Sequence, residues 1–226
     1  KQTKWSVMKT LIFKEVDDLI IGSLGIVAFI SFFVGGVVAI QTALNLTNPL
    51  IPKSLMGFAT RQSVILEFGP TFISVIMAGK MGSFITSTIG TMRVTEQIDA
   101  LEVMGVNALN YLVFPKLIAL LLYPFVIGIA MFLGILGGYV AAVYGGFGNG
   151  SDFIIGLQKD FVPFHIAYAF IKTFVFGLVL ATIPSFHGFY MKGGALEVGK
   201  ASTVAFVWTS VMIILLNYIL TQLLLT

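Results

Sequence analysis

Cysteine is absent from this chain of 226 residues, and charged residues are scarce. Without cysteine there is no disulfide framework, no thiolate nucleophile and no Cys-ligated metal. Only 10% of the residues are charged, whereas a soluble domain usually has about a quarter. Apolar residues are abundant instead: 58% of the chain is hydrophobic and the mean hydropathy is +1.00. The composition therefore predicts an integral membrane protein.

Residue sets that carry out chemistry are also missing. The two histidines, His165 and His187, fall on opposite sides of the membrane in the topology given below, and neither has an acid and a nucleophile nearby. Residues 194–200 have the spacing of a phosphate-binding loop, but Ala201 stands where that loop needs Ser or Thr, and no strand precedes it. We expect no catalytic residue, metal site or cofactor, and no ATP hydrolysis by this chain. A net charge of +3 is too small to suggest nucleic acid.

Five apolar runs are each long enough to cross about 30 Å of hydrocarbon. The sequence therefore predicts an all-α membrane protein with one transmembrane domain, 1–226, and spans at 19–41, 63–88, 117–144, 161–186 and 201–226. Residues 1–18 mix charges with Trp5 and aliphatic side chains, which is typical of an interfacial helix at headgroup depth. The alternative for this segment is a polar lead-in to the first span.

Small residues recur at every fourth position in three of these spans. The stripes are Ser31, Gly35, Ala39 and Ala43; Ser74, Ala78, Gly82 and Thr86; and Ala130, Gly134, Gly138 and Ala142. Such stripes allow two helices to approach closely within a membrane. We therefore expect these spans to pack tightly against their neighbours.

The second span contains three residues that are unusual in an apolar helix: Glu67, Pro70 and Lys80. Pro70 is predicted to bend the helix, and Lys80 is long enough to reach the interface. An ionisable group at membrane depth usually faces a cavity or a partner. Glu67 therefore either faces such a site or lies at the headgroup boundary near Arg61, and both interpretations stay open.

A polar stretch separates the second and third spans and is predicted to form an amphipathic helix over 90–105. Its apolar side carries Val94, Ile98 and Leu101, and its other side carries Glu96, Asp99 and Glu102. Thr91 is the expected N-cap and Gly105 the expected C-terminal stop. The acids of this helix should face water or a partner.

The basic residues favour one orientation in the membrane. Nine of the thirteen lie on the N-terminal side: Lys1, Lys4, Lys9, Lys14, Lys80, Arg93, Lys116, Lys192 and Lys200. By the positive-inside rule the N-terminus, the 90–105 helix and a polar 187–200 loop are cytoplasmic, and the C-terminus is outside. Five spans are few for a complete transport path, so we expect a homodimer.

Three motifs resemble the signature of MlaE-type permeases, the membrane subunits of MCE-linked ABC transporters that move phospholipids or other lipids across the envelope of diderm bacteria. They are Glu67-Phe68-Gly69-Pro70, Ala78-Gly79-Lys80-x-Gly82 and the run from Gly90 to Gly105, which includes Thr95-Glu96-Gln97-Ile98-Asp99-Ala100-Leu101-Glu102. The resemblance extends over nearly the whole chain, through 112–116 and 134–138.

This resemblance implies the MlaE-type permease fold, an interfacial helix followed by five spans, as a homodimer in the bacterial inner membrane. It also implies a separate cytoplasmic ABC ATPase, a periplasmic MCE-domain protein and a phospholipid held between the two subunits, in a system that maintains outer-membrane lipid asymmetry. The expected lipid-binding residues are Glu67, Leu66, Phe68, Val38 and Gln41. The 90–105 segment becomes the coupling helix, with Arg93, Glu96, Asp99 and Glu102 at the ATPase.

One departure and one alternative accompany this interpretation. The family often has Arg where this chain has Leu66, so substrate or mechanism can differ here. The alternative function is a membrane anchor or scaffold for envelope lipid-binding proteins that transports nothing itself. Glu67 discriminates between them, because a passive anchor has little use for an ionisable group at that depth.

Overall fold

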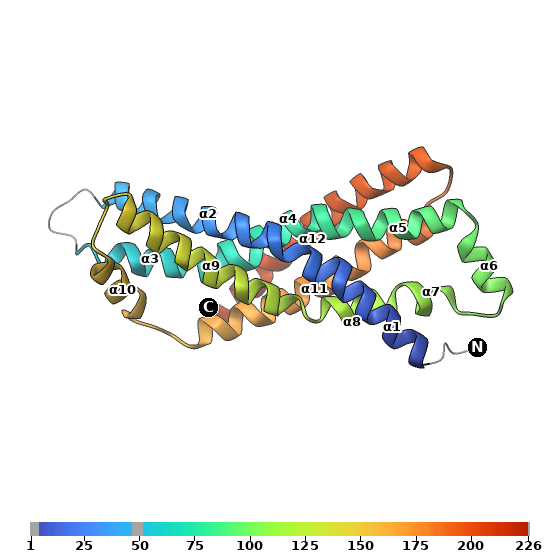
Figure 1. Ribbon diagram of the computed structural model, residues 1–226, viewed down its shortest axis with the longest axis horizontal. Helices are drawn as coiled ribbons and strands as arrows, with labels where there is room; N and C mark the ends of the chain where they lie inside the picture. The colour runs from blue at the N-terminus through green and yellow to red at the C-terminus, as the bar shows by residue number, and fades with distance from the viewer. Residues whose placement is uncertain (1–4, 47–51, 226) are drawn as a thin grey trace. The chain divides into compact units, whose positions relative to one another are not determined.

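The computed structural model describes residues 5–46 and 52–225, and every regular element among them is a helix (Figure 1). The predicted all-α fold is confirmed. The first half of the chain forms α1 (Trp5–Glu15), η1 (Val16–Ile21), α2 (Gly22–Asn45), α3 (Leu55–Ser63), η2 (Val64–Phe72), α4 (Ile73–Met77), η3 (Ala78–Gly82), α5 (Ser83–Val94) and α6 (Gln97–Val103). The second half forms α7 (Ala108–Leu112), α8 (Phe114–Leu120), α9 (Tyr123–Tyr144), α10 (Gly150–Gln158), α11 (Phe164–Tyr190) and α12 (Ala195–Leu225). The ends of the expected 1–18 and 201–226 segments, with Lys1 and Lys4, lie outside the described residues.

Five helical runs are long and apolar enough to cross a membrane, which confirms the number predicted. They are Trp5–Asn45, Leu55–Val94, Ala108–Tyr144, Phe164–Tyr190 and Ala195–Leu225. Four of these runs begin before the predicted spans, because residues outside the apolar stretches continue the helices, whereas the fourth begins at Phe164, inside the predicted 161–186 span. The N-terminal helix joins the first span without a break. The polar loop expected over 187–200 is confined to 191–194, since α11 ends at Tyr190 and α12 begins at Ala195.

Three segments are π-helical rather than α-helical: η1, η2 and η3. The segment η2 contains Pro70, at the position where the sequence predicts a bend. Proline lacks the backbone N–H that an α turn uses, and π turns are one way in which a helix accommodates such a defect. The structure therefore places a π-helical segment at Pro70, and the bend itself stays a prediction.

The chain divides into two compact units, each described here by itself. Unit 1 comprises 1–23, 74–123 and 174–226, and unit 2 comprises 24–73 and 124–173. Helices α2, α4, α9 and α11 contribute residues to both units.

Unit 2 is held together by helices that touch backbone to backbone. A Cβ placed on Gly35 of α2 would lie 1.8 Å from the carbonyl oxygen of Gly134 on α9. A Cβ on Gly137 would lie 1.9 Å from the carbonyl oxygen of Phe32. Only glycine permits so close an approach. The small-residue stripes predicted on the first and third spans therefore meet in a contact of α2 with α9.

A second close contact in unit 2 joins α3 and α10, which lie side by side in Figure 1. A Cβ on Gly57 of α3 would lie 2.1 Å from the carbonyl oxygen of Phe153 on α10. The Phe153 ring is fully buried and packs in one core cluster with Ala39, Met56 and Ala142. This cluster fastens the short α10 to the longer helices.

Arg61 also connects α3 to α10. Its side chain is almost fully buried, and it donates hydrogen bonds to the carbonyl oxygens of Leu157 (2.5 Å), Lys159 (2.9 Å) and Asp160 (3.2 Å). The last carbonyls of a helix have no partner within the helix, so Arg61 caps α10.

In unit 1, several contacts between helices are made by side-chain hydroxyl groups. Its hydrogen bonds link Ser87 to Ser202 (2.9 Å), Thr86 to the Pro184 carbonyl oxygen (3.0 Å) and Ser74 to Tyr123 (2.9 Å). The first of these bonds lies between α5 and α12, which pack together. Beyond this contact α12 is the least buried of the five long runs. Its exposed apolar side chains include Val204, Val207, Trp208, Val211, Leu215 and Tyr218.

Candidate functional site

A buried ion pair in unit 2 contains the carboxylate that the sequence singles out. Lys172 of α11 is fully buried, and its Nζ lies 3.1 Å from Glu67 Oε1 on η2. The second carboxylate oxygen, Oε2, accepts a hydrogen bond from the Thr71 hydroxyl at 3.0 Å. The Glu67 side chain nevertheless keeps 44% of its surface exposed. One partner of this pair is therefore fixed inside the fold while the other remains open to contact.

Lys172 is anchored at two further points. Its Nζ donates to the Tyr168 hydroxyl at 2.7 Å and to the Leu66 carbonyl oxygen at 3.1 Å. Pro70 removes one backbone donor from the turn that follows Leu66, and the lysine supplies a donor to that turn. The ammonium therefore uses acceptors of three kinds: a carboxylate, a carbonyl and a phenol. A buried charge is tolerated when it is paired in this way.

The structure gives Glu67 a different partner from the one the sequence offered, and the depth of Glu67 in the membrane stays a prediction. Arg61, which the sequence offered as its neighbour, caps α10, whereas Glu67 pairs with Lys172. The sequence marks Lys172 as a charge inside the fourth span but gives no indication of its partner, which lies 105 residues away. The only sequence feature that could have indicated this pairing is that Glu67 and Lys172 are opposite charges within apolar spans, since such residues tend to pair with one another.

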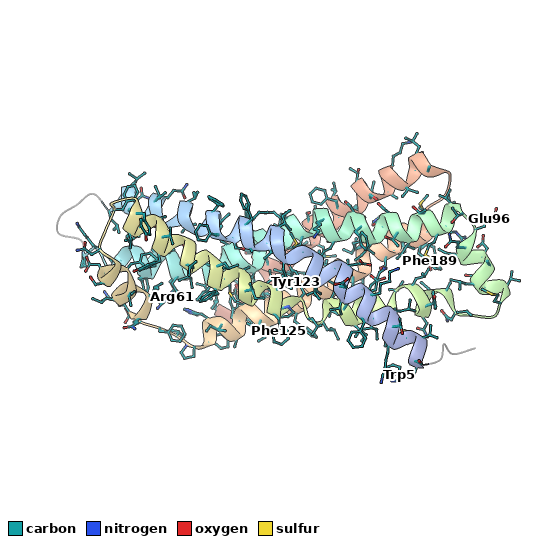
Figure 2. All side chains as sticks on the ribbon, viewed as in Figure 1. Trp5, Arg61, Glu96, Tyr123, Phe125 and Phe189 are labelled. Carbon is teal, nitrogen blue, oxygen red and sulfur yellow. The ribbon has the colours of Figure 1, made fainter. Side chains whose placement is uncertain are left out.

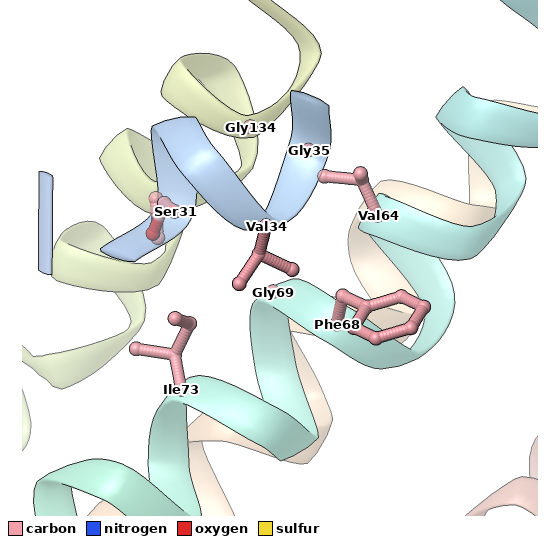
Figure 3. A pocket seen from close by; sticks show the side chains of 9 residues that line it. Ser31, Val34, Gly35, Val64, Phe68, Gly69, Ile73 and Gly134 are labelled. Atoms are coloured by element: carbon pink, nitrogen blue, oxygen red, sulfur yellow. The ribbon is translucent and has the colours of Figure 1, made fainter. Parts of the chain in front are cut away.

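A small cavity lies in unit 2 beside this pair's helix. It has a volume of about 10 Å³, between α2, the η2–α4 segment and α9. Figure 3 shows Val34 of α2 pointing toward the turn at Gly69. The Ser31 hydroxyl also lines the cavity and has no hydrogen-bond partner among the described residues. Pockets for small-molecule ligands measure about 300–1,000 Å³. This cavity is therefore too small to enclose a lipid.

The five residues predicted to bind lipid have different environments. Phe68 lines the cavity, and Glu67 and Leu66 precede it on η2, with Leu66 offering its carbonyl to Lys172. On α2, Val38 is buried and Gln41 is exposed. The structure thus gathers Leu66, Glu67 and Phe68 on one helical turn. A single chain provides no lipid-sized pocket around all five among the cavities described.

The predicted coupling helix is shorter than the 90–105 segment proposed from the sequence. Helix α5 runs through Thr91 to Val94, so Thr91 is not an N-cap and that prediction is wrong. The chain then turns at Glu96, whose φ of 58° is left-handed, before α6 begins at Gln97 (Figure 2). Nothing in the local sequence signals this turn, because glutamate seldom adopts that conformation. Gly105, with φ of +72°, ends the segment as predicted.

The amphipathic pattern of this segment is confirmed on α6. Ile98 is fully buried, whereas Glu96, Asp99 and Glu102 are all exposed. Arg93 at the end of α5 pairs with Asp99, with Nη1 2.7 Å from Oδ1. Both side chains of this pair are accessible to solvent, so the pair leaves its charges available to a partner.

Apolar side chains extend the exposed surface of α6. Val103 is 89% exposed and Met104 is 64% exposed, directly after the acid at position 102. A groove of about 530 Å³ lies between Glu102, the α6–α7 connection and the end of α11 at Phe189 and Tyr190. Exposed apolar groups with a charged rim are typical of a protein-binding surface. The residues described contain no cluster of ligands able to hold a metal ion.

Helices of this length and apolarity, with charges paired inside the fold, are those of a multi-pass membrane protein. The chain belongs to the MlaE permease family, whose sequence model, Permease MlaE, matches residues 12–223. The resemblance seen in the motifs is thereby confirmed. Members of this family are permease subunits and not the ATPase of the transporter, so this chain is a permease subunit.

Individual relatives narrow this class to ABC transporter permeases. The chain is 36% identical over 215 residues to a probable ABC transporter permease protein of Rickettsia bellii, covering 95% of this chain and 83% of the relative. It is 32% identical to the chloroplast protein TRIGALACTOSYLDIACYLGLYCEROL 1 of Arabidopsis thaliana, covering 88% of this chain and 57% of the relative. It is 29% identical to the intermembrane phospholipid transport system permease protein MlaE of Haemophilus influenzae, covering 93% and 81%.

Proposed function

We propose that this chain is the permease subunit of an ABC transporter that moves phospholipids or related lipids in the bacterial envelope. It acts as a homodimer in the inner membrane, with its N-terminus in the cytoplasm and its C-terminus in the periplasm. A separate cytoplasmic ATPase drives it, and a periplasmic MCE-domain protein exchanges lipid with it. The distribution of basic residues supports this orientation.

One observation carries the lipid assignment. Glu67 is half exposed within an apolar span, and it is held there by a lysine with no exposed surface. Keeping an ionisable pair at this depth is costly, so such pairs usually serve a pathway or a bound polar group. The name of the Haemophilus influenzae relative, a phospholipid transport permease, supports a lipid as the substrate.

The exposed apolar surface of α12 supports a second copy of the chain as part of the lipid site. Trp208 and Tyr218 are 57% and 71% exposed on that helix. The cavity described beside η2 in one chain has a volume of only about 10 Å³, so a lipid needs further walls. A second subunit would provide these walls, and the predicted lipid-binding residues Val38 and Gln41 of α2 would contribute to the same site.

Glu67→Gln tests the lipid assignment. The amide keeps the shape of the side chain and an acceptor for Lys172 but removes the charge, so the fold should persist with a lower Tm. We expect ATP-driven lipid transfer in proteoliposomes to fall about tenfold or more, as when a charge-assisted hydrogen bond is lost. Asp152→Asn on α10 is the matched control and should leave transfer unchanged. Unchanged transfer in Glu67→Gln would favour the alternative of a passive anchor.

Charge reversal on α6 tests the ATPase assignment separately. Glu96→Lys, Asp99→Lys and Glu102→Lys together should abolish co-purification of the ATPase and lipid-stimulated ATP hydrolysis, because charge complementarity at an interface becomes repulsion. Asp152→Lys is the control, since α10 lies on the predicted periplasmic side. Undiminished co-purification and hydrolysis in the triple variant would rule out this face as the coupling surface.

A further inference from the structure

A larger pocket, distinct from the cavity beside Glu67, lies within unit 1. It has a volume of about 190 Å³ and lies between α1, α5, α7 and α8. This volume is below the range of about 300–1,000 Å³ typical of sites that enclose a whole ligand, so the pocket can hold only one end of a larger molecule. Its walls are mostly apolar, with Leu11, Ile89, Met92 and Leu112 among them. The pocket therefore suits a ligand with a substantial apolar part.

The polar end of this pocket contains a buried ion pair whose hydrogen bonding is incomplete. Lys116 is only 2% exposed and Glu15 18%, and the lysine Nζ bonds to Glu15 Oε1. The other carboxylate oxygen, Oε2, is buried and has no hydrogen-bond partner among the described residues. A buried carboxylate oxygen without a donor is costly, so this position favours a ligand that donates a hydrogen bond.

The same end of the pocket also favours an anionic group. An ammonium has three donors, so Lys116 can bond a second acceptor while it keeps Glu15. Lys14 lines the pocket as well and adds a second positive charge. A phosphate bound between the two lysines would make charge-assisted hydrogen bonds. The pocket therefore offers complementary places for a phosphate, a donor group and an apolar chain.

We propose that this pocket binds a phospholipid whose headgroup carries a hydrogen-bond donor beyond its phosphate, such as phosphatidylethanolamine. The phosphate accepts hydrogen bonds from Lys116 and Lys14, and the ammonium donates to Glu15 Oε2. The start of the acyl region lies along Leu11 and Met92. A choline headgroup fits poorly because its nitrogen has no N–H. The site belongs to each chain singly and does not depend on lipid transport.

Lipid titration of the full-length permease in detergent tests this site. The protein is stripped of lipid and titrated with phosphatidylethanolamine or phosphatidylcholine of the same acyl chains, and bound lipid is counted by native mass spectrometry. We expect the ethanolamine lipid to bind about tenfold more tightly, the effect of one hydrogen bond to a charged group. Equal affinities of the wild-type protein for the two lipids would overturn the proposal.

Variants assign the preference to this pocket. Glu15→Gln places a donor where the ligand needs an acceptor, so the preference should disappear. Glu15→Leu with Lys116→Met replaces the pair by apolar groups of similar size, which often preserves folding, and should remove this binding event. Glu197→Gln, in the exposed pair with Lys200, is the control and should keep the preference.

Two further measurements separate this site from the transport site and from a soluble ligand. The Glu67→Gln variant should keep the preference for phosphatidylethanolamine over phosphatidylcholine. If this preference is lost in Glu67→Gln but kept in Glu15→Gln, the proposed site is wrong, and the transport assignment is unaffected. Free phosphoethanolamine at the lipid's concentration should not displace the lipid, because it lacks the apolar part. Full displacement would assign the pocket to a small soluble ligand instead.

Discussion

The two units each contain a buried lysine, and the surroundings of the two side chains differ. In unit 2, Lys172 bonds to a carboxylate, a carbonyl and a phenol, and nearby helices touch through glycine. In unit 1, Lys116 bonds to one carboxylate oxygen at the edge of a pocket. A lysine with several partners is part of the structural framework, whereas one with few partners leaves capacity for a ligand. Unit 2 should therefore tolerate substitution less well than unit 1.

The largest effect should follow from Lys172→Met in unit 2. The change leaves Glu67 and the Leu66 carbonyl without their lysine. Breaking a fully buried pair costs about 3–5 kcal/mol, and the lower end applies here because Glu67 is 44% exposed. Thermal unfolding in detergent should show a markedly lower Tm. The double variant Lys172→Met with Glu67→Leu should recover most of this stability, because neither charge remains. A double variant as unstable as the single one would contradict the role given to the pair.

A slightly smaller loss is expected from Gly35→Ala. The new Cβ would lie 1.8 Å from the Gly134 carbonyl oxygen, so α2 and α9 must separate, at a cost of about 3 kcal/mol. Gly199→Ala on α12 is the comparison in unit 1, where a Cβ meets nothing within 4 Å. Alanine is the better helix former, so this variant should gain about 0.5–1 kcal/mol. Losses of equal size in the two variants would remove the contrast between the units.

An intermediate effect is expected from Arg61→Lys. An ammonium cannot reproduce the planar fork that reaches Leu157, Lys159 and Asp160, so the cap on α10 weakens by about 2 kcal/mol. Hydrogen exchange should become faster in α10 while α2 stays protected. Equal protection of α10 in the variant and the parent protein would show that the charge alone holds this helix.

The smallest effect should come from Glu197→Gln. Its partner Lys200 is 63% exposed, and such surface pairs contribute about 0–1 kcal/mol. Unfolding curves of the variant and the parent protein should nearly coincide at physiological salt. A loss comparable to that of Lys172→Met would mean that exposure is a poor guide to the strength of these pairs.

Periodic features were predictable from the sequence and long-range pairings were not. The five runs, the stripes that meet at Gly35 and Gly134, and the buried Ile98 all follow from spacing along one helix. The pairs of Lys172 with Glu67 and Lys116 with Glu15 join residues about a hundred positions apart, and spacing says nothing about them. Each of these two ion pairs depends on how the helices pack, which spacing along one helix does not determine.

The candidate coupling segment also combines features that the sequence predicts with one that it does not. Its exposed acids follow from a helical wheel, and its end follows from Gly105. Its start does not, because the turn at Glu96 is imposed on a residue with no preference for it. Helix α5, whose Ile89 and Gly90 are buried, instead continues through Thr91 to Val94.

The wide turn around Pro70 has a consequence for how mutations along the second membrane run should be grouped. A π turn takes up one residue more than an α turn, which shifts the residues after it by about 100° around the helix axis. The helical phase of positions after Phe72 therefore differs from that of positions before Val64. A single helical wheel drawn from Leu55 to Val94 would superpose side chains that face different directions. Removal of one residue inside η2 would rotate everything beyond it relative to Arg61 and its helix.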